Sequence, residues 1–369
     1  MPVKICLLSV EIFAWGKYGG FGRATRNIGR ELARLGHEVS AITPRRESQG
    51  EVETLDGITV LGYSQYRPWD IYRLAKSCQA DVYHSCEPSL ATYIARRAAP
   101  DSVHIVTARD PRDWKDWRVE LTLPSKNRVR TVASMFFENN LLATHAVRKA
   151  DAVYTAFNDA IPKVKAKYGL AEDPRFLPTP TPLPTQPTKS GTPKVCFVAR
   201  LDRRKRPHLF MDLADRFPEV EFVALGAARN SNWEQALRQT YGARANLTIA
   251  GFVDQFRSPY YSEVLSQSWI LINTSVREGL PNAFIEAAAH GCAILSSVDT
   301  DGFASRFGET VSDDDFATGL RALLENDRWR ECGARARRFV AETFETEVAI
   351  KAHIDAYEHA LSAAGTRSE

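Results

Sequence analysis

The sequence has little cysteine, and its cysteines follow no metal-binding or disulfide pattern. The chain of 369 residues contains six, none of them spaced as C-x-x-C. Structural zinc sites need closely spaced ligands, and disulfide frameworks need many cysteines in a short chain. We expect neither, and the reducing cytoplasm is the expected compartment. The six are Cys6, Cys78, Cys86, Cys196, Cys292 and Cys332.

Long apolar runs are also missing. The opening residues MPVKICLLSVEIF hold only a short apolar run. A signal peptide needs roughly 7 to 15 apolar residues, and a membrane-spanning helix needs about 18. We therefore expect neither kind of segment.

Composition and length indicate a globular protein with two domains. Hydrophobic residues make up 44% of the chain and charged residues 25%, as in ordinary globular proteins. Because one domain holds roughly 100 to 200 residues, two are expected. The net charge of +3 is unevenly divided: residues 1–180 hold 26 Lys/Arg against 20 Asp/Glu, and the remainder holds 22 against 25. The first half is the basic half, and no nucleic-acid partner is expected.

The densest group of cations lies between Arg96 and Arg130, interleaved with Trp114 and Trp117. A solvated face explains such a segment, and so does a patch that binds an anion or touches a membrane surface. The second interpretation predicts an anionic acceptor, such as a phosphorylated lipid carrier or an acidic saccharide, and peripheral contact with the inner membrane surface. The cations are Arg96, Arg97, Arg109, Arg112, Lys115, Arg118, Lys126, Arg128 and Arg130.

The order of the apolar runs predicts an α/β protein. VKICLLSV (3–10), VHIVTA (103–108) and ADAVYTA (150–156) are typical of strands, and helical segments separate them. Such alternation favours a parallel sheet covered by helices. It restarts at KVCFVAR (194–200). We expect two doubly wound domains that face a central cleft, with ligands at the carboxyl ends of the strands.

The expected boundaries follow from this pattern. Residues 1–172 form the first domain and 194–345 the second. Residues 173–193 are rich in proline, which ends helices and favours an extended path, so they are expected to be the linker. Residues 346–369 are expected to form a helix that crosses back to the first domain.

Two loops at strand ends are candidates for binding phosphate. YGGFGR, with Gly19, Gly20 and Gly22, opens a helix whose N–H groups favour a phosphate; it is also explained as an ordinary turn. It lacks the third glycine of a dinucleotide fingerprint. In VARLDRRKRPHLF, Arg200 and Lys205 suit a diphosphate, although four consecutive basic residues from Arg203 to Arg206 are equally explained as solvent-facing charge.

A third loop, VREGLPNAFIEAAAHG (276–291), carries two carboxylates. Glu286 lies in an alanine-rich helix, where a buried carboxylate needs a partner, and a pair of ribose hydroxyls fits that need. Glu278 is expected to hold sugar hydroxyls, while the backbone from Leu280 to Ala283 offers N–H groups at the start of the helix. A capped helix with a surface loop is the alternative.

VARLDRRK, TIAGFV and REGLPNAFIEAAAHG, in this order and spacing, resemble the donor-binding half of the retaining glycosyltransferases of family 4. The resemblance extends over the whole chain, since GGFGR is similar to the family's N-terminal glycine loop. It implies the GT-B fold, with two Rossmann-like domains. It also implies a nucleotide-diphospho-sugar donor, a saccharide or lipid-linked acceptor and a role in polysaccharide biosynthesis.

The resemblance implies roles for individual residues. Arg200 and Lys205, with the glycine loop, bind the donor pyrophosphate; Glu278 contacts the transferred sugar and Glu286 the ribose. Arg109 stands where many members carry a histidine in a T-x-H-D context, and is counted with the catalytic candidates. The other donor-binding candidates are Gly251, Phe252, Val253, Gly279, Leu280, Pro281, Asn282 and Ala283.

We expect no metal and no cofactor. DTD (299–301) and DDD (313–315) imitate metal-binding triplets but are not expected beside the diphosphate loops. Arg200 and Lys205 neutralise the leaving phosphate instead. His84, at a strand end, is more readily explained as structural than as functional.

The expected function is therefore transfer of a sugar from a nucleotide-diphospho-sugar to an acceptor hydroxyl, with retention. Because Arg109 replaces a histidine, a non-catalytic nucleotide-sugar-binding or scaffold subunit is the second hypothesis. A nucleotide-sugar epimerase is the third. A nicotinamide oxidoreductase is disfavoured by the broken glycine fingerprint.

Overall fold

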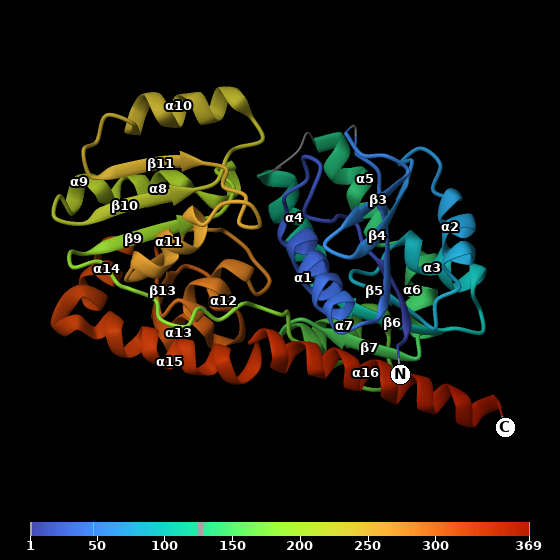
Figure 1. Cartoon of the computed structure of the whole chain (residues 1–369). Helices are drawn as coiled ribbons and strands as arrows, with labels where there is room; N and C mark the ends of the chain where they lie inside the picture. Colours follow the sequence, from blue (N-terminus) through green and yellow to red (C-terminus); the bar gives the residue numbers. More distant parts are fainter. Residues whose placement is uncertain (1, 47, 124–127, 369) are drawn as a thin grey trace. The chain divides into compact units, whose positions relative to one another are not determined.

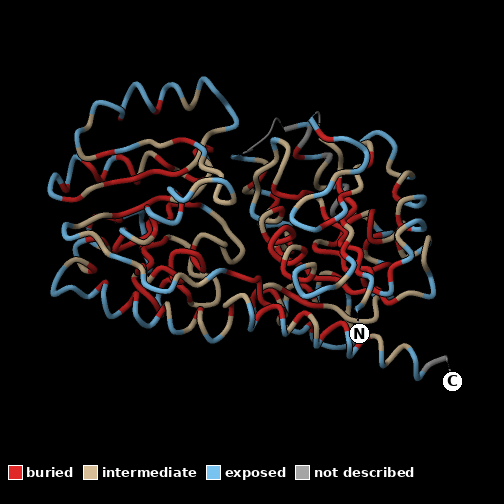
Figure 2. Tube along the Cα trace, viewed as in Figure 1, coloured by how far each residue is buried: buried red, intermediate tan, exposed pale blue. Residues whose placement is uncertain are grey.

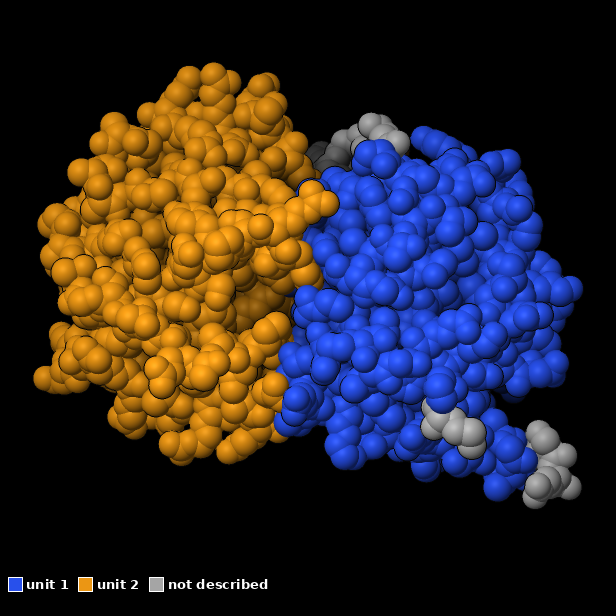
Figure 3. All heavy atoms as spheres, viewed as in Figure 1, with its two compact units in different colours: residues 1–113, 132–180, 346–369 blue, residues 114–131, 181–345 orange. Residues whose placement is uncertain are grey.

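The computed structural model of the protein describes residues 2–46, 48–123 and 128–368. It consists of two compact α/β units (Figure 3). Unit 1 contains residues 1–113, 132–180 and 346–369, and unit 2 contains residues 114–131 and 181–345. The two-domain α/β architecture predicted from the alternating runs is therefore confirmed.

Unit 1 is built on a sheet of eight strands among the described residues, in the order β3-β4-β2-β1-β5-β6-β7-β8 (Figure 1). Its neighbours pair in parallel, except that β3 and β4 form an antiparallel pair. The strands are β1 (Lys4–Leu8), β2 (Glu38–Pro44), β3 (Val52–Leu55), β4 (Ile58–Tyr63), β5 (Val82–Ser85), β6 (Val103–Ala108), β7 (Ala152–Thr155) and β8 (Arg175–Phe176).

Helices cover both faces of this sheet because its central strands are apolar on both sides. In β1, Ile5 and Leu7 belong to a core shared with the C-terminal helix α16, whereas Cys6 and Leu8 belong to a core shared with α2 and α3. Alternate residues of a strand point to opposite faces. The helices are α1 (Gly20–Arg34), α2 (Asp70–Cys78), α3 (Leu90–Ala98), α5 (Arg128–Glu138, across the unit boundary), α6 (Leu141–Arg148), α7 (Ala160–Tyr168) and α16 (Thr346–Ser368).

Unit 2 holds a sheet of six parallel strands among the residues described, in the order β11-β10-β9-β12-β13-β14. Figure 2 shows buried residues along its strands and exposed residues on the outer sides of its helices. The strands are β9 (Lys194–Val198), β10 (Glu221–Leu225), β11 (Leu247–Gly251), β12 (Ile270–Asn273), β13 (Ala293–Ser296) and β14 (Gly308–Thr310).

The described helices of unit 2 are α4 (Trp114–Thr122), α8 (Pro207–Met211), α9 (Leu213–Arg216), α10 (Ser231–Tyr241), α11 (Tyr260–Gln267), α12 (Asn282–Ala289), α13 (Phe303–Phe307), α14 (Phe316–Leu324) and α15 (Arg328–Thr343). Of these, α8, α9, α10, α14 and α15 contribute to an apolar core with the sheet, in which the rings of Trp269 and Trp329 stack with centroids 4.5 Å apart. Short 3₁₀ turns are η1 (Arg203–Lys205), η2 (Thr300–Gly302) and η3 (Glu325–Asp327).

The proline-rich stretch 173–193 is divided between the units rather than left as a separate linker. Its first part adds β8 to the sheet of unit 1, and Leu177 and Thr179 are buried there. From Thr181 onward the stretch belongs to unit 2, where Thr181 pairs with Glu345. The chain thus passes between the units after residues 113, 131, 180 and 345. Helix α16, which follows the last of these passages, belongs to unit 1.

None of the helices in the described part of the chain has the length and apolar content needed to traverse a bilayer.

Candidate functional site

The Arg200–Lys205 loop of unit 2 connects strand β9 to helix α8. Arg206 adopts a left-handed conformation, with φ of 46°, at the start of α8. Its guanidinium donates to Thr274 O at 2.7 Å, to the Asp314 carboxylate at 2.7 Å and to Ser297 Oγ at 3.1 Å. Asp314 belongs to the DDD triplet, so the expectation that this triplet lies away from the diphosphate loops is wrong. Asp314 fixes the side chain of Arg206, the residue that follows Lys205.

Lys205 and Glu278 form an ion pair at the carboxyl ends of β9 and β12. Both side chains are mostly buried, and Ser275 Oγ donates to the same oxygen of Glu278 at 2.8 Å. Burial lowers the pKa of Lys205 despite the neighbouring Glu278. Burial alone would raise the pKa of Glu278, but Lys205, Arg204 and Ser275 outweigh it and hold that pKa below its usual range. Two residues 73 positions apart in the sequence are thus brought into one charged pair.

Arg200 also has a carboxylate beside it. Its Nη1 lies 3.0 Å from Asp202 Oδ2, and the other oxygen of Asp202 accepts the backbone N–H of Arg229 at 3.1 Å. The side chain of Arg200 is 28% exposed, against 10% for Lys205. Arg200 is therefore the more accessible of the two cations. Lys205 is mostly buried, so the alternative in which the whole loop is solvent-facing charge does not hold for this residue.

Glu286 lies on the buried side of α12 and accepts a hydrogen bond from the hydroxyl of Tyr261 on α11. Its backbone oxygen lies 2.8 Å from Nδ1 of His290, whose Nε2 lies 2.9 Å from Ser262 Oγ. Tyr261 is a site residue that sequence reasoning missed. It is 25 residues from Glu286 and belongs to no motif.

The remaining donor-site candidates lie at two strand ends of unit 2. Residues Gly279 to Ala283 are half-buried between Glu278 and α12, which begins after Pro281 without a side-chain cap among the described residues. Gly251, with φ of 77°, ends β11, and Phe252 after it is 45% exposed while Val253 is half-buried. The structure thus directly joins Lys205 to Glu278, which shares the connection from β12 to β13 with Glu286, whereas the Gly251–Val253 turn follows β11.

The glycine loop of unit 1 surrounds a carboxylate of the chain itself. Glu11 Oε1 accepts the backbone N–H of Gly22 at 3.1 Å, and Glu11 Oε2 lies 3.1 Å from Lys17 Nζ. A Cβ at Gly19 would stand 1.9 Å from Glu11 Oε1, and one at Gly22 would stand 2.8 Å from the backbone of Ile12 and Phe13. Gly22 is needed for this close packing because its neighbours are backbone atoms, whereas the Glu11 carboxylate beside Gly19 belongs to a flexible side chain. The sequence leaves the start of α1, including Gly20, as a phosphate cradle or an ordinary turn; in the structure, Glu11 accepts the N–H of Gly22 there.

Arg109 follows β6 and is buried with two unsatisfied donors. Its side chain is 6% exposed, its Nη1 donates to Thr179 Oγ1 at 2.7 Å, and its backbone N–H donates to Glu87 Oε2 at 2.8 Å. Nε and Nη2 have no hydrogen-bond partner among the residues that the structure describes. Burial lowers the pKa of this guanidinium. A fork of two parallel N–H groups matches a carboxylate or a phosphate.

His84 is structural, as the sequence favoured. It is fully buried, with Nε2 2.7 Å from Thr107 Oγ1 and Nδ1 2.8 Å from the hydroxyl of Tyr357 on α16. His353, also on α16, lies with Nε2 3.0 Å from Pro178 O. Burial lowers the pKa of both histidines, that of His353 to about 3. These contacts fasten the C-terminal helix to the sheet of unit 1.

Acid is expected to loosen this attachment. Because the unfolded chain binds a proton on His353 near pH 6.5 and the folded chain only near pH 3, stability is complete above pH 6.5 and falls as pH falls through this window. At pH 5 the cost is about 2 kcal/mol for His353. Hydrogen exchange of the amides of β5 and β6 should therefore be faster at pH 5 than the intrinsic rate predicts. The variant His353→Gln should lose part of this effect; an unchanged pH dependence in the variant would contradict the assignment.

The basic segment 96–130 does not form one patch of available cations. Arg112 pairs with Asp110 at 3.0 Å, and Trp117 is buried, whereas Trp114 is 71% exposed. Lys126 lies outside the described residues, as do the side chains of Arg128 and Arg130. Lys115 and Arg118 are exposed on α4. Neutralising Arg112 would break an internal ion pair, so it is a poor probe of acceptor binding.

The two acidic triplets have structural partners. Asp299 accepts the N–H of Ser305 at 3.0 Å, and Asp315 caps α14 by accepting the N–H of Thr318 at 3.2 Å. Together with the Asp314–Arg206 pair, these contacts engage Asp299, Asp314 and Asp315 in bonds within the protein.

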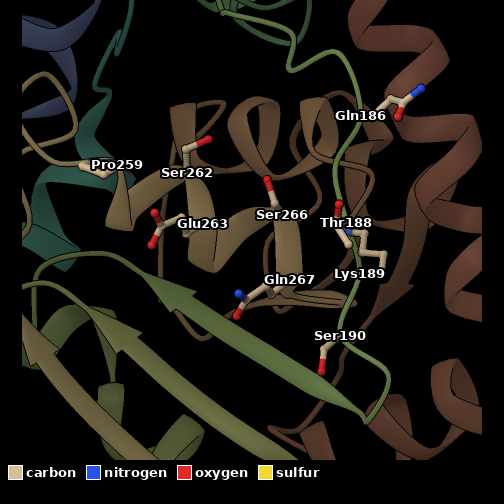
Figure 4. Close-up of a pocket in the computed structure, with 9 residues that line it drawn as sticks. All are labelled: Gln186, Thr188, Lys189, Ser190, Pro259, Ser262, Glu263, Ser266 and Gln267. Carbon is tan, nitrogen blue, oxygen red and sulfur yellow. The ribbon is translucent and has the colours of Figure 1, made fainter.

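A separate hollow of about 580 Å³ lies beside α11 in unit 2 (Figure 4). Side chains of α11, among them Ser262 and Ser266, face the segment that carries Thr188 and Lys189 across it. Lys189 Nζ donates to Ser268 O at 2.5 Å. None of the predicted site residues lines this hollow.

Both halves of the chain match family models of glycosyltransferases. Residues 183–339 match the family described as Glycosyl transferases group 1, and residues 18–180 match Glycosyltransferase Family 4. The chain therefore carries glycosyltransferase domains in both halves. A search of curated protein sequences gives no match.

Solved structures show the same fold across nearly the whole chain. Sucrose-phosphate synthase from Thermosynechococcus elongatus is 16% identical, with a TM-score of 0.75 over 97% of this chain and 99% of that one. HepE from Anabaena, in complex with UDP and glucose, is 13% identical, with a TM-score of 0.72 over 96% and 99%. The catalytic domain of starch synthase IV from Arabidopsis thaliana, bound to ADP and acarbose, is 12% identical, with a TM-score of 0.64 over 98% and 100%. At these identities the likeness shows the GT-B fold.

Proposed function

We propose that the protein is a retaining, metal-independent glycosyltransferase that moves a sugar from a nucleotide-diphospho-sugar to an acceptor hydroxyl. The observation that carries this proposal is the buried Lys205–Glu278 pair, which lies at the carboxyl ends of β9 and β12 within a glycosyltransferase domain. The carboxyl edge of a parallel sheet is where nucleotides bind in such folds. Arg200, more exposed, stands on the same loop.

In this proposal the cations act on the leaving group. Arg200 and Lys205 bind the diphosphate and stabilise the charge that develops as the bond between sugar and phosphate breaks. The acceptor hydroxyl enters on the face from which the diphosphate leaves, which retains the configuration, and its proton passes to an oxygen of the departing diphosphate. Glu278 orients Lys205 and contacts the transferred sugar, and Glu286 binds the ribose hydroxyls.

The proposal includes an anionic or lipid-linked acceptor and a cytoplasmic enzyme with peripheral membrane contact. The support for an anionic acceptor is Arg109, whose Nε and Nη2 lack partners among the described residues although the side chain is buried. A buried, incompletely paired guanidinium is costly unless an anion completes its hydrogen bonds. The exposed Trp114, Lys115 and Arg118 of α4 support the membrane contact.

A panel of UDP-, GDP- and ADP-sugars tests the reaction, because HepE and starch synthase IV carry different nucleotides on the same fold. Incubation with the correct donor should release its nucleoside diphosphate slowly, as measured by mass spectrometry. A chelator should change this rate less than about twofold if no metal stabilises the leaving group. Thermal stabilisation without nucleotide release would favour a binding subunit instead. Isomerised sugar still attached to its nucleotide would favour an epimerase.

A further inference from the structure

Helix α4 is attached to both charged loops of the proposed donor site. Glu120 pairs with Arg204, the residue before Lys205, and Arg277, the residue before Glu278, donates to Asp116 Oδ1 at 2.6 Å. All four side chains are between 6% and 15% exposed. Two buried ion pairs thus connect α4 to Arg204 and Arg277, and each of these directly precedes one member of the Lys205–Glu278 pair.

The helix presents one face to these loops. Asp116 and Glu120 are four residues apart and therefore lie on the same side of α4. Trp117 beside them is 2% exposed, whereas Trp114 is 71% exposed and Lys115 and Arg118 are also exposed. From the sequence, this segment is either a solvated face or an anion-binding patch; its inward face carries two carboxylates that pair with cations of the donor loops.

Arg204 acts electrostatically on both members of the Lys205–Glu278 pair. It is among the charges that lower the pKa of Glu278, and it also lowers the pKa of Lys205. A buried guanidinium that loses its carboxylate is drawn toward another, because an unpaired buried charge is strongly unfavourable. Loss of the Glu120–Arg204 ion pair therefore favours competition between Arg204 and Lys205 for Glu278.

We propose that α4 is a positioning clamp for the diphosphate-binding loops. Glu120 holds Arg204, and Asp116 holds Arg277. These contacts keep Lys205 and Glu278 in the ion pair to which the donor binds. This inference rests on the proposed function, because it assigns the clamp to the same donor site. Glu120 and Asp116 are positioning residues: they act through Arg204 and Arg277.

The test compares nucleoside diphosphates with monophosphates. Calorimetry with UDP, GDP and ADP identifies the diphosphate that the wild-type protein binds. For that nucleotide, Glu120→Gln should raise Kd about tenfold, a coupling of the size found between contacting charged residues. Kd for the corresponding monophosphate should change less than about twofold. The reason is that the clamp positions Lys205, which binds the second phosphate in the proposed site. Asp116→Asn should show the same selectivity.

A double-mutant cycle separates positioning from general damage. In the Arg204→Gln background, Glu120→Gln should have no further effect on the diphosphate Kd, since the competing cation is gone. Asp215→Asn is the matched control: it breaks the Asp215–Arg244 pair of unit 2, in which Asp215 is 56% exposed, and should leave both Kd values unchanged. Hydrogen exchange should become faster in residues 114–122 of the Glu120→Gln variant while the strands of unit 2 stay protected.

The outcomes distinguish failure of the clamp from failure of the proposed function. Equal losses for mono- and diphosphate, additive effects in the cycle, or unchanged exchange of α4 would overturn the clamp and leave the proposed function standing. A wild-type protein that binds none of the three diphosphates would overturn both.

Discussion

Replacing Lys205 with alanine is expected to lower kcat/KM for sugar transfer by roughly 10²–10³, the loss typical when one preorganised charge-stabilising group is removed. Lys205 is the buried cation of the donor loop, and its ammonium neutralises the departing diphosphate in the proposed reaction. The matched control is Arg203→Ala. Arg203 lies in the same 3₁₀ turn but is exposed and stacks over Trp233 at 4.5 Å. That variant should retain transfer within about threefold.

Measurements of stability separate the effect of the Lys205 charge from the effect of its packing. Lys205→Met leaves Glu278 buried without its main partner, which should destabilise unit 2 by about 3 kcal/mol or more. Adding Glu278→Gln removes the stranded charge, so the double variant should recover melting temperature without recovering activity. If the Lys205 variants transferred sugar at the rate of Arg203→Ala, Lys205 would have no part in the reaction.

Replacing Glu286 with alanine is expected to raise the donor KM by about 10- to 100-fold, with a smaller change in kcat. Ribose hydroxyls are bound equally before and during the reaction, and loss of such uniform binding appears mainly in KM. Tyr261→Phe is the matched comparison, because it removes the hydroxyl that donates to Glu286 and leaves the carboxylate in place. We expect it to raise KM by only about three- to tenfold.

Donor analogues lacking ribose hydroxyls give the sharper measurement. A site that hydrogen-bonds a hydroxyl rejects an analogue without it. Wild-type protein should therefore discriminate against a dideoxyribose nucleotide, and Glu286→Ala should lose most of that discrimination. Equal discrimination in both proteins would show that Glu286 supports α11 through Tyr261 instead of binding the ribose.

Local patterns were enough to predict the two sheets. Strand β1 shows why: its four residues from Ile5 to Leu8 are all buried, two on each face, so the sequence shows a continuous apolar run. The charged loops at the strand ends were found for a similar reason, since each follows directly on such a run. Resemblance to a family added the link between loops that lie far apart in the chain.

Pairings over long separations could not be predicted. Nothing near Glu120 indicates that it meets Arg204, 84 residues away, or that Asp116 meets Arg277, 161 residues away. Glu11 is a similar case: its carboxylate fills the start of α1, where the glycines alone suggested a phosphate. Glycine spacing shows that the backbone comes close to something, and the identity of that group depends on the tertiary structure.

Helix α16 has a consequence for the way this protein is made. The core of unit 1 includes Ile350 and Tyr357, which are synthesised after residues 181–345 of unit 2. At a translation rate of about 5 to 20 residues per second, roughly 9 to 35 seconds pass between residue 180 and Tyr357. During this interval the nascent unit 1 lacks the apolar contacts of α16, while unit 2 receives nearly all of its residues. The half that is synthesised first is therefore the half that is finished last.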